Sequence, residues 1–186
     1  MSSPDKTRAE RSLREKGSRK TGDRGGLYGR SHAGRTRRLA FAAMFAALAL
    51  IFSYVEMLVP IPVPIPGVKL GLANLVILIA LYRLGFRYAF TINCVRIVIA
   101  GLLFSGVFGM LYSFGGGILS ILVMSLLYRT KLFSMVGISM AGGVMHNLGQ
   151  LLTACAIMSN ISLLSYFAVL FFSGLISGIL IGILAY

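Results

Sequence analysis

The distribution of apolar and polar residues divides this chain into a polar N-terminal segment and six long apolar stretches. Apolar residues become almost continuous near residue 39 and are interrupted only by short groups of proline, glycine and charged residues. A helix needs about 20 apolar residues to cross the hydrocarbon of a membrane, and somewhat fewer where the bilayer thins. We predict about six spans, over residues 39–59, 70–84, 88–105, 110–127, 133–158 and 163–186. The predicted fold class is therefore all-α, a polytopic membrane protein.

The connection between the first two predicted spans begins an unusual run, PIPVPIPGVKLGLAN, over residues 60–74. Proline occupies every second position at its start, and proline cannot donate to a helical hydrogen-bond ladder. We therefore predict a stiff, non-helical connection. Its apolar residues, followed by Lys69 and Asn74, fit either a lid over a cavity or a short loop along the lipid headgroups.

Composition supports a membrane protein, because 57% of the 186 residues are hydrophobic and the mean hydropathy is +0.85. Residues 1–38 hold 12 of the 18 Lys and Arg residues and 4 of the 5 Asp and Glu residues. This segment has too few apolar residues to fold alone, so we predict a basic, disordered, cytoplasmic tail over 1–38 and a membrane domain over 39–186. Some basic tails bind nucleic acid. A tail that directly precedes a span favours a role in membrane topology or lipid contact, and we expect no nucleic-acid partner.

The remaining cations indicate the orientation of the predicted spans. Four of them lie in two short connections, residues 82–87 and 128–131, whereas the connections on the opposite side hold only Lys69. Positively charged loops stay on the cytoplasmic side of a membrane. We therefore predict that these two connections and both chain termini are cytoplasmic.

Arg96 lies near the middle of the third predicted span, with Asn93 three residues before it on the same helical face. An arginine at the centre of a membrane helix costs about 2.5 to 3.5 kcal/mol on insertion scales, so it must face a partner or a cavity. Glu56 is the only acidic residue after residue 38 and is one candidate partner. The alternative is that Arg96, together with Lys69, binds an anionic ligand.

The fifth predicted span carries three neighbouring polar side chains, His146, Asn147 and Gln150. On a helix these residues occupy an arc of about 100°. They fit the wall of a binding pocket. The alternative is that they form hydrogen bonds to neighbouring helices, which are worth only about 0.6 kcal/mol each in a membrane. We adopt the pocket as our hypothesis.

The first predicted span begins with alanines spaced four residues apart, Ala42 with Ala46 and Ala43 with Ala47. Small residues at this spacing form a flat stripe that lets another helix approach closely. The alternative is that alanine is simply common in membrane helices. The stripe is a candidate docking face for a partner.

Three runs occur in this order along the chain: PIPGVKLGLANLVILIALYRLG (64–85), LLFSGVFGMLYSFGGG (102–117) and GGVMHNLGQL (142–151). Together they resemble the Gx transporter family, which is also known as heptaprenyl diphosphate synthase component I. The resemblance covers about residues 38–186 and leaves out the basic tail. That family is similar to the substrate-binding S components of energy-coupling factor transporters. Relatives are also linked to flavin-based extracellular electron transfer in Gram-positive bacteria.

The resemblance implies a six-helix, S-component-like bundle in a bacterial cytoplasmic membrane. It implies a small ligand, such as a flavin, a quinone or isoprenoid precursor, or another vitamin, under a lid between the first two helices. It also implies that a T component, with its ATPase subunits, docks on the alanines of the first span. Combined with the polar residues described above, the candidate substrate-binding residues are Lys69, Asn74, Asn93, Arg96, His146, Asn147 and Gln150.

Composition excludes a catalytic prenyl synthase. Chain elongation needs aspartate clusters that hold Mg²⁺, but the only aspartates are Asp5 and Asp23, isolated in the tail. The sequence contains no Walker motif and no metal-ligand spacing, and we expect no cofactor. Our first hypothesis is a membrane-embedded substrate-binding subunit of an importer. The alternative is a non-catalytic membrane component associated with a soluble heptaprenyl diphosphate synthase or with an electron-transfer assembly.

Overall fold

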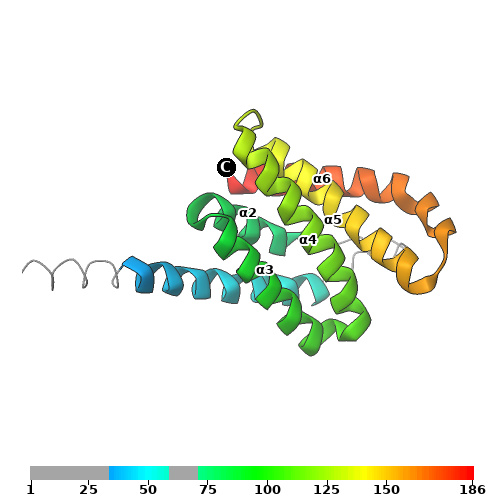
Figure 1. The fold of residues 1–186 in the computed structure, drawn as a ribbon, viewed down its shortest axis with the longest axis horizontal. Helices are drawn as coiled ribbons and strands as arrows, with labels where there is room; N and C mark the ends of the chain where they lie inside the picture. Colours follow the sequence, from blue (N-terminus) through cyan, green and yellow to red (C-terminus); the bar gives the residue numbers. More distant parts are fainter. Residues whose placement is uncertain (1–33, 59–70) are drawn as a thin grey trace, which may run out of the picture. The chain divides into compact units, whose positions relative to one another are not determined.

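The computed structural model describes residues 34–58 and 71–186, and every regular element in these ranges is helical (Figure 1). The first helix is Gly34–Leu58. The later α-helices are α2 Leu72–Leu84, α3 Phe86–Ala100, α4 Gly106–Thr130, α5 Met135–Met158 and α6 Phe167–Ala185. A π-helix, η1 (Gly101–Ser105), precedes α4, and a 3₁₀-helix, η2 (Ile161–Tyr166), precedes α6. The predicted all-α class is confirmed.

The chain divides into two units between Phe41 and Ala42. The described residues of the first unit, 34–41, form the start of the first helix. Among them, the Arg37 guanidinium lies 5.6 Å from the centre of the Phe41 ring. The second unit contains the rest of the first helix and all later elements, including the candidate site described below.

Three helical segments of the described chain are long and apolar enough to cross a membrane: Gly34–Leu58, Phe86–Thr130 and Ile161–Ala185. Each of the six stretches predicted from the sequence corresponds to a helix, with ends that differ by a few residues. Helix α2 has only 13 residues, about 20 Å at 1.5 Å per residue, so it is shorter than the ~30 Å hydrocarbon core. Whether all six cross a membrane stays a prediction.

Glycines and a serine define several helix boundaries. Gly85, with φ 88°, lies between α2 and α3, and Gly106, with φ 68°, is the first residue of α4, directly after η1. Residues with a β-carbon rarely adopt this positive φ, so glycine is suited to both breaks. Helix α5 begins after Ser134, whose side chain accepts a hydrogen bond of 3.2 Å from the Gly137 backbone N–H. This is a common N-cap arrangement.

Helix α2 supplies the centre of the apolar core. Apart from Asn74, Tyr82 and Arg83 its residues are apolar, and they face several directions, a pattern expected of a helix that is enclosed by others. Leu78 and Ala80 are fully buried, and they belong to a core cluster that also contains Ala49 of the first helix, Ile121 of α4 and residues of α3, α5 and α6. The short length of α2 is therefore compatible with a position inside the protein.

Helices α4, α5 and α6 pack closely through glycines. A β-carbon at Gly149 of α5 would collide with the Gly115 carbonyl oxygen and would lie 2.8 Å from the Cα of Gly116 in α4. On the other side of α5, a β-carbon at Gly143 would collide with the Gly174 carbonyl oxygen of α6. Such backbone-to-backbone approach is typical of helices that associate in membranes through small residues.

Candidate functional site

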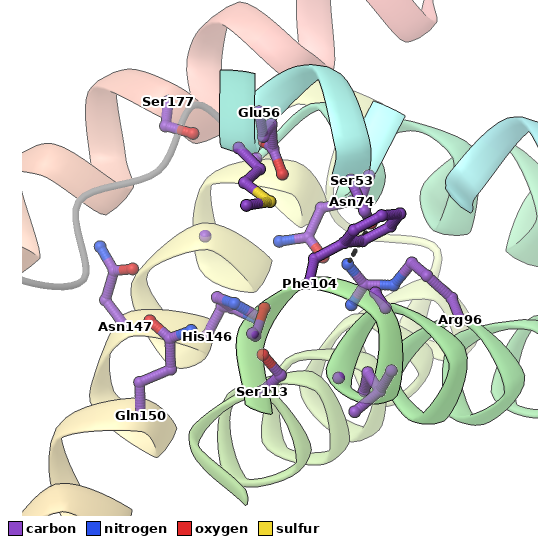
Figure 2. A pocket seen from close by; sticks show the side chains of 18 of the residues that line it. Ser53, Glu56, Asn74, Arg96, Phe104, Ser113, His146, Asn147, Gln150 and Ser177 are labelled. Carbon is purple, nitrogen blue, oxygen red and sulfur yellow. Dashed lines mark hydrogen bonds between the residues drawn. The ribbon is translucent and has the colours of Figure 1, made fainter. Parts of the chain in front are cut away.

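A cavity of about 140 Å³ lies among the helices (Figure 2). The first helix, α2, α3, η1, α4, α5 and α6 all contribute to its lining. Its polar and charged lining side chains are Ser53, Glu56, Asn74, Arg96, Ser105, Ser113, His146, Asn147, Gln150 and Ser177. A cavity of this volume could hold about four or five water molecules at their liquid density, so it has room for a small group.

Arg96 is the buried cation of this cavity. Its side chain is only 8% exposed, and its Nη2 donates a hydrogen bond of 2.9 Å to Asn93 Oδ1. Its Nη1 lies 3.5 Å from the hydroxyl oxygen of Ser53, at the outer limit of a hydrogen bond. Within the described residues, Nε has no hydrogen-bond partner. A guanidinium carries five N–H donors, so Arg96 keeps unused donor capacity beside the cavity.

Asn93 holds Arg96 in place and does not itself line the cavity. It is 1% exposed, and its amide nitrogen donates a hydrogen bond of 3.0 Å to the Gly117 carbonyl oxygen of α4. A β-carbon at Gly117 would lie 2.9 Å from that amide nitrogen, so glycine makes room for Asn93. Both ends of the Asn93 amide are thereby engaged, and the guanidinium is oriented before any ligand arrives.

Glu56 also lines the cavity, but its hydrogen bonding differs from the pairing considered from the sequence. Its Oε1 accepts a hydrogen bond of 2.5 Å from the Leu72 backbone N–H, in the first turn of α2. A carboxylate at this position satisfies one of the unpaired N–H groups of a helix start and interacts favourably with the helix dipole. The hydrogen bonds of Arg96 at 2.9 Å and 3.5 Å go to Asn93 and Ser53, and Glu56 interacts with Arg96 through its charge.

The polar cluster of α5 lies at the cavity. His146, Asn147 and Gln150 all line it, and Figure 2 shows His146 and Gln150 on the side across from Arg96. The Asn147 amide nitrogen also donates a hydrogen bond of 2.7 Å to the Leu170 carbonyl oxygen of α6. The sequence left open whether this cluster lines a pocket or forms hydrogen bonds to neighbouring helices. Asn147 does both, since it lines the cavity and connects α5 to α6.

The π-helix η1 brings an aromatic side chain to the cavity. Gly101, Phe104 and Ser105 of η1 line it, and the Phe104 ring lies 5.2 Å, centre to centre, from the Tyr54 ring of the first helix. A π-turn inserts an extra residue into a helical turn and is frequent at functional sites. The tilted ring pair connects the first helix to η1 at the edge of the cavity.

Five of the seven predicted binding residues line the cavity: Asn74, Arg96, His146, Asn147 and Gln150. Asn93 lies behind Arg96, and Lys69 lies outside the described residues. The sequence did not single out the serines at 53, 105, 113 and 177. A polar residue within an apolar stretch was the available signal, but serine often bonds to its own helix, as the Ser53 hydroxyl does to the Ala49 carbonyl oxygen at 2.9 Å.

The predicted docking alanines lie on two faces of the first helix. Ala42 is 8% exposed and belongs to the core of the chain, and Ala46 packs partly against that core. Ala43 and Ala47 are exposed. Ala42 is therefore occupied by contacts within this chain, whereas Ala43 and Ala47 remain accessible for the predicted docking. The described residues contain no group of three or more His, Cys, Asp or Glu placed to hold a metal ion.

The family model of heptaprenyl diphosphate synthase component I matches residues 45–186. The chain belongs to this family. The match contains every residue that lines the cavity, and it confirms the family recognised from the three sequence runs. No curated protein matches this component I chain, and no solved structure matches it.

Proposed function

We propose that this component I chain is a non-catalytic membrane component that works with a heptaprenyl diphosphate synthase. The observation that carries this proposal is the family match, which begins inside the first helix and extends over all later helices. The absence of aspartate after residue 23 supports a non-catalytic role, since Mg²⁺-dependent diphosphate chemistry relies on carboxylate ligands. The soluble catalytic subunit would then be a separate protein.

The finer topology belongs to the same proposal. A straight helix over Phe86–Thr130 would be about 68 Å long, more than twice the hydrocarbon thickness. The break at Gly106 favours two crossings in this stretch. With the first helix, α2, α5 and α6 the chain would cross six times in an S-component-like bundle of a bacterial cytoplasmic membrane. The connections that contain Arg83, Arg87 and Arg129 would be cytoplasmic, with both termini.

Recovery of the synthase with membranes tests this role. When the chain and the catalytic synthase subunit of the same bacterium are produced together, we expect the synthase to sediment with membranes and to copurify in detergent. We also expect the distribution of prenyl product lengths to differ from that of the synthase alone. An unrelated membrane protein of similar size is the control. A synthase that stays soluble, with unchanged products, would contradict the proposal.

A second role is favoured by the cavity itself: a small-molecule-binding subunit, as in an S-component-like importer. The cavity gathers a cation from α3, an imidazole and two amides from α5 and a third amide from α2, a combination typical of ligand sites. Lys69, the second cation predicted from the sequence for this ligand, lies outside the described residues. Candidate ligands are a flavin, a quinone or isoprenoid precursor, or another vitamin. In an importer, a T component with its ATPase subunits would dock beside Ala43 and Ala47.

Native mass spectrometry of the detergent-purified protein tests this second role. We expect wild-type protein to carry a defined small mass, and we expect the double variant Arg96→Ala/His146→Ala to lose it because both residues line the cavity. The matched control is Thr91→Ala/Ser165→Ala, which changes two exposed residues whose hydroxyls bond to their own helical segments. Retention of the mass by the cavity variant, or no mass on either protein, would count against this role.

A further inference from the structure

The chemistry around Arg96 defines the class of molecule that the cavity accepts. The guanidinium is more than nine-tenths buried, lines the cavity, and has an Nε–H with no partner among the described residues. A buried charge is retained where it is paired or where it faces a polar cavity. The hydrogen bonds that Arg96 makes go to an amide and a hydroxyl, which are neutral groups. Its charge interacts at a distance with Glu56 of the same cavity, and neither of these two hydrogen bonds goes to a carboxylate, so an anion in the cavity could bind it directly.

Asn93 holds the Arg96 guanidinium in one orientation. It accepts from Arg96 Nη2 at 2.9 Å while its own amide nitrogen is held by the Gly117 carbonyl oxygen at 3.0 Å. These two bonds restrict the rotation of the guanidinium. A planar guanidinium that is already oriented binds carboxylate or phosphate oxygens with less loss of conformational freedom. The arrangement thus resembles a prepared anchor for an oxyanion.

Other lining residues add groups that can donate hydrogen bonds. Asn74, Gln150 and Ser113 carry amide or hydroxyl donors and line the same cavity as Arg96 (Figure 2). The acidic lining residue is Glu56, and its Oε1 accepts from the Leu72 backbone N–H. The cavity wall is therefore richer in donors than in acceptor-only groups, which suits a ligand with several acceptor oxygens.

The cavity volume limits the size of this ligand. At about 140 Å³ the cavity is less than half the lower end of the 300 to 1,000 Å³ typical of pockets for drug-sized molecules. Two of its lining residues, Met57 and Ser105, are exposed, so the cavity reaches the surface of the described chain beside the first helix and η1. It can hold a small anion entirely, or the anionic headgroup of a larger molecule whose apolar part remains outside.

We infer that this cavity is an oxyanion site in which Arg96 is the anchor and Asn93 is its positioning residue. The inference rests on the small-molecule-binding role proposed above and names the ligand class: a carboxylate, phosphate or diphosphate group, free or at the head of an apolar molecule. Glu56 is the opposing charge in the same cavity and weakens binding of any anion.

Ligand-dependent thermal stability in nanodiscs of zwitterionic lipid tests the inference. The probes are acetate, inorganic diphosphate and farnesyl diphosphate, with farnesol as the uncharged control. We expect at least one anionic probe to stabilise the wild type, and Arg96→Gln to bind it roughly 10- to 100-fold more weakly, because a charge-assisted hydrogen-bond pair is lost. Stabilisation by the free anions indicates a water-soluble ligand. Stabilisation by farnesyl diphosphate alone indicates a headgroup.

Further variants at Arg96, Asn93 and Glu56 test whether Arg96 binds the anion directly. Arg96→Lys keeps the charge but loses the planar fork, so we expect intermediate affinity. Asn93→Ala leaves Arg96 intact but unoriented, so we expect affinity to fall several-fold without loss of folded protein, and Asn93→Gln to restore part of it. Glu56→Gln removes the opposing charge, so we expect tighter binding of the same probe.

The result that overturns the inference is equal stabilisation of wild type and Arg96→Gln by every anionic probe, or stabilisation of neither. If native mass spectrometry still detects a bound molecule in that case, the cavity binds a ligand and only its assigned class is wrong. If no bound molecule is detected either, the small-molecule-binding role itself fails. Recovery of the synthase with membranes is independent of both outcomes.

Discussion

Replacing Gly149 with alanine is expected to lower stability by about 3 kcal/mol, because the new methyl group has no space in the contact between α4 and α5. The added β-carbon would collide with the Gly115 carbonyl oxygen and lie 2.8 Å from the Cα of Gly116. These are backbone atoms, so no side-chain rotation relieves the collision. The two helices must separate, and the separation reaches His146 and Gln150, which line the cavity from the same part of α5.

Thermal unfolding in detergent or nanodiscs measures this effect. A protein of this length loses about 2 to 4 °C in unfolding midpoint for each kcal/mol, so we expect a drop of about 6 to 12 °C. Gly137→Ala is the matched control in the same helix, because the atom nearest to its new β-carbon is 3.6 Å away. Alanine there should leave stability unchanged or raise it by up to about 1 kcal/mol through better helix propensity. Similar destabilisation by both variants would contradict the close contact at Gly149.

Replacing Leu78 with alanine is expected to lower stability by about 2 kcal/mol. Leu78 is 0% exposed and lies within α2, whose buried residues form the centre of the core. In water, truncation of a buried leucine costs about 2 to 5 kcal/mol, from lost transfer free energy plus the cavity left behind. Lipid is as apolar as leucine, so the transfer contribution largely disappears in a membrane and the packing contribution remains. The lower end of the range therefore applies.

Leu126→Ala is the matched control for the core substitution. Leu126 lies on α4 with a 64% exposed side chain, so its removal leaves no internal cavity. We expect a change of less than about 0.5 kcal/mol for Leu126→Ala, against a midpoint lowered by about 4 to 8 °C for Leu78→Ala. If Leu78→Ala were as well tolerated as Leu126→Ala, α2 would not be enclosed as the structure describes.

The sequence predicted the position of the candidate site because polar residues are rare in its apolar stretches. Arg96 and His146 were noticeable for that reason alone, and both line the cavity. Spacing also placed Asn93 on the same helical face as Arg96, which is correct. A shared face does not reveal that Asn93 also forms a hydrogen bond to another helix. Gly117 lies 24 residues from Asn93, and its carbonyl oxygen makes Asn93 a support for Arg96.

Sequence reasoning was weaker where a residue has several ordinary roles. Ser53 looks like any serine in a membrane helix, and it does bond to its own helix. Its second contact, to Arg96, joins residues 43 positions apart, which no local pattern can reveal. The alanine stripe shows the same limit, because spacing alone does not say that Ala42 packs inside the chain while Ala43 is exposed.

The sequence by itself determined the helices, their approximate ends, the family and the identity of the rare polar residues. Hydropathy, proline and glycine act over a few neighbouring residues, so their effects can be recognised without the fold. Only the tertiary structure decided what each polar group contacts. It placed the Glu56 carboxylate on the N–H of Leu72 at the start of α2, and it left the Nε of Arg96 beside the cavity without a partner in the described chain. These contacts join residues distant in sequence, and they depend on how closely the helices pack at their glycines.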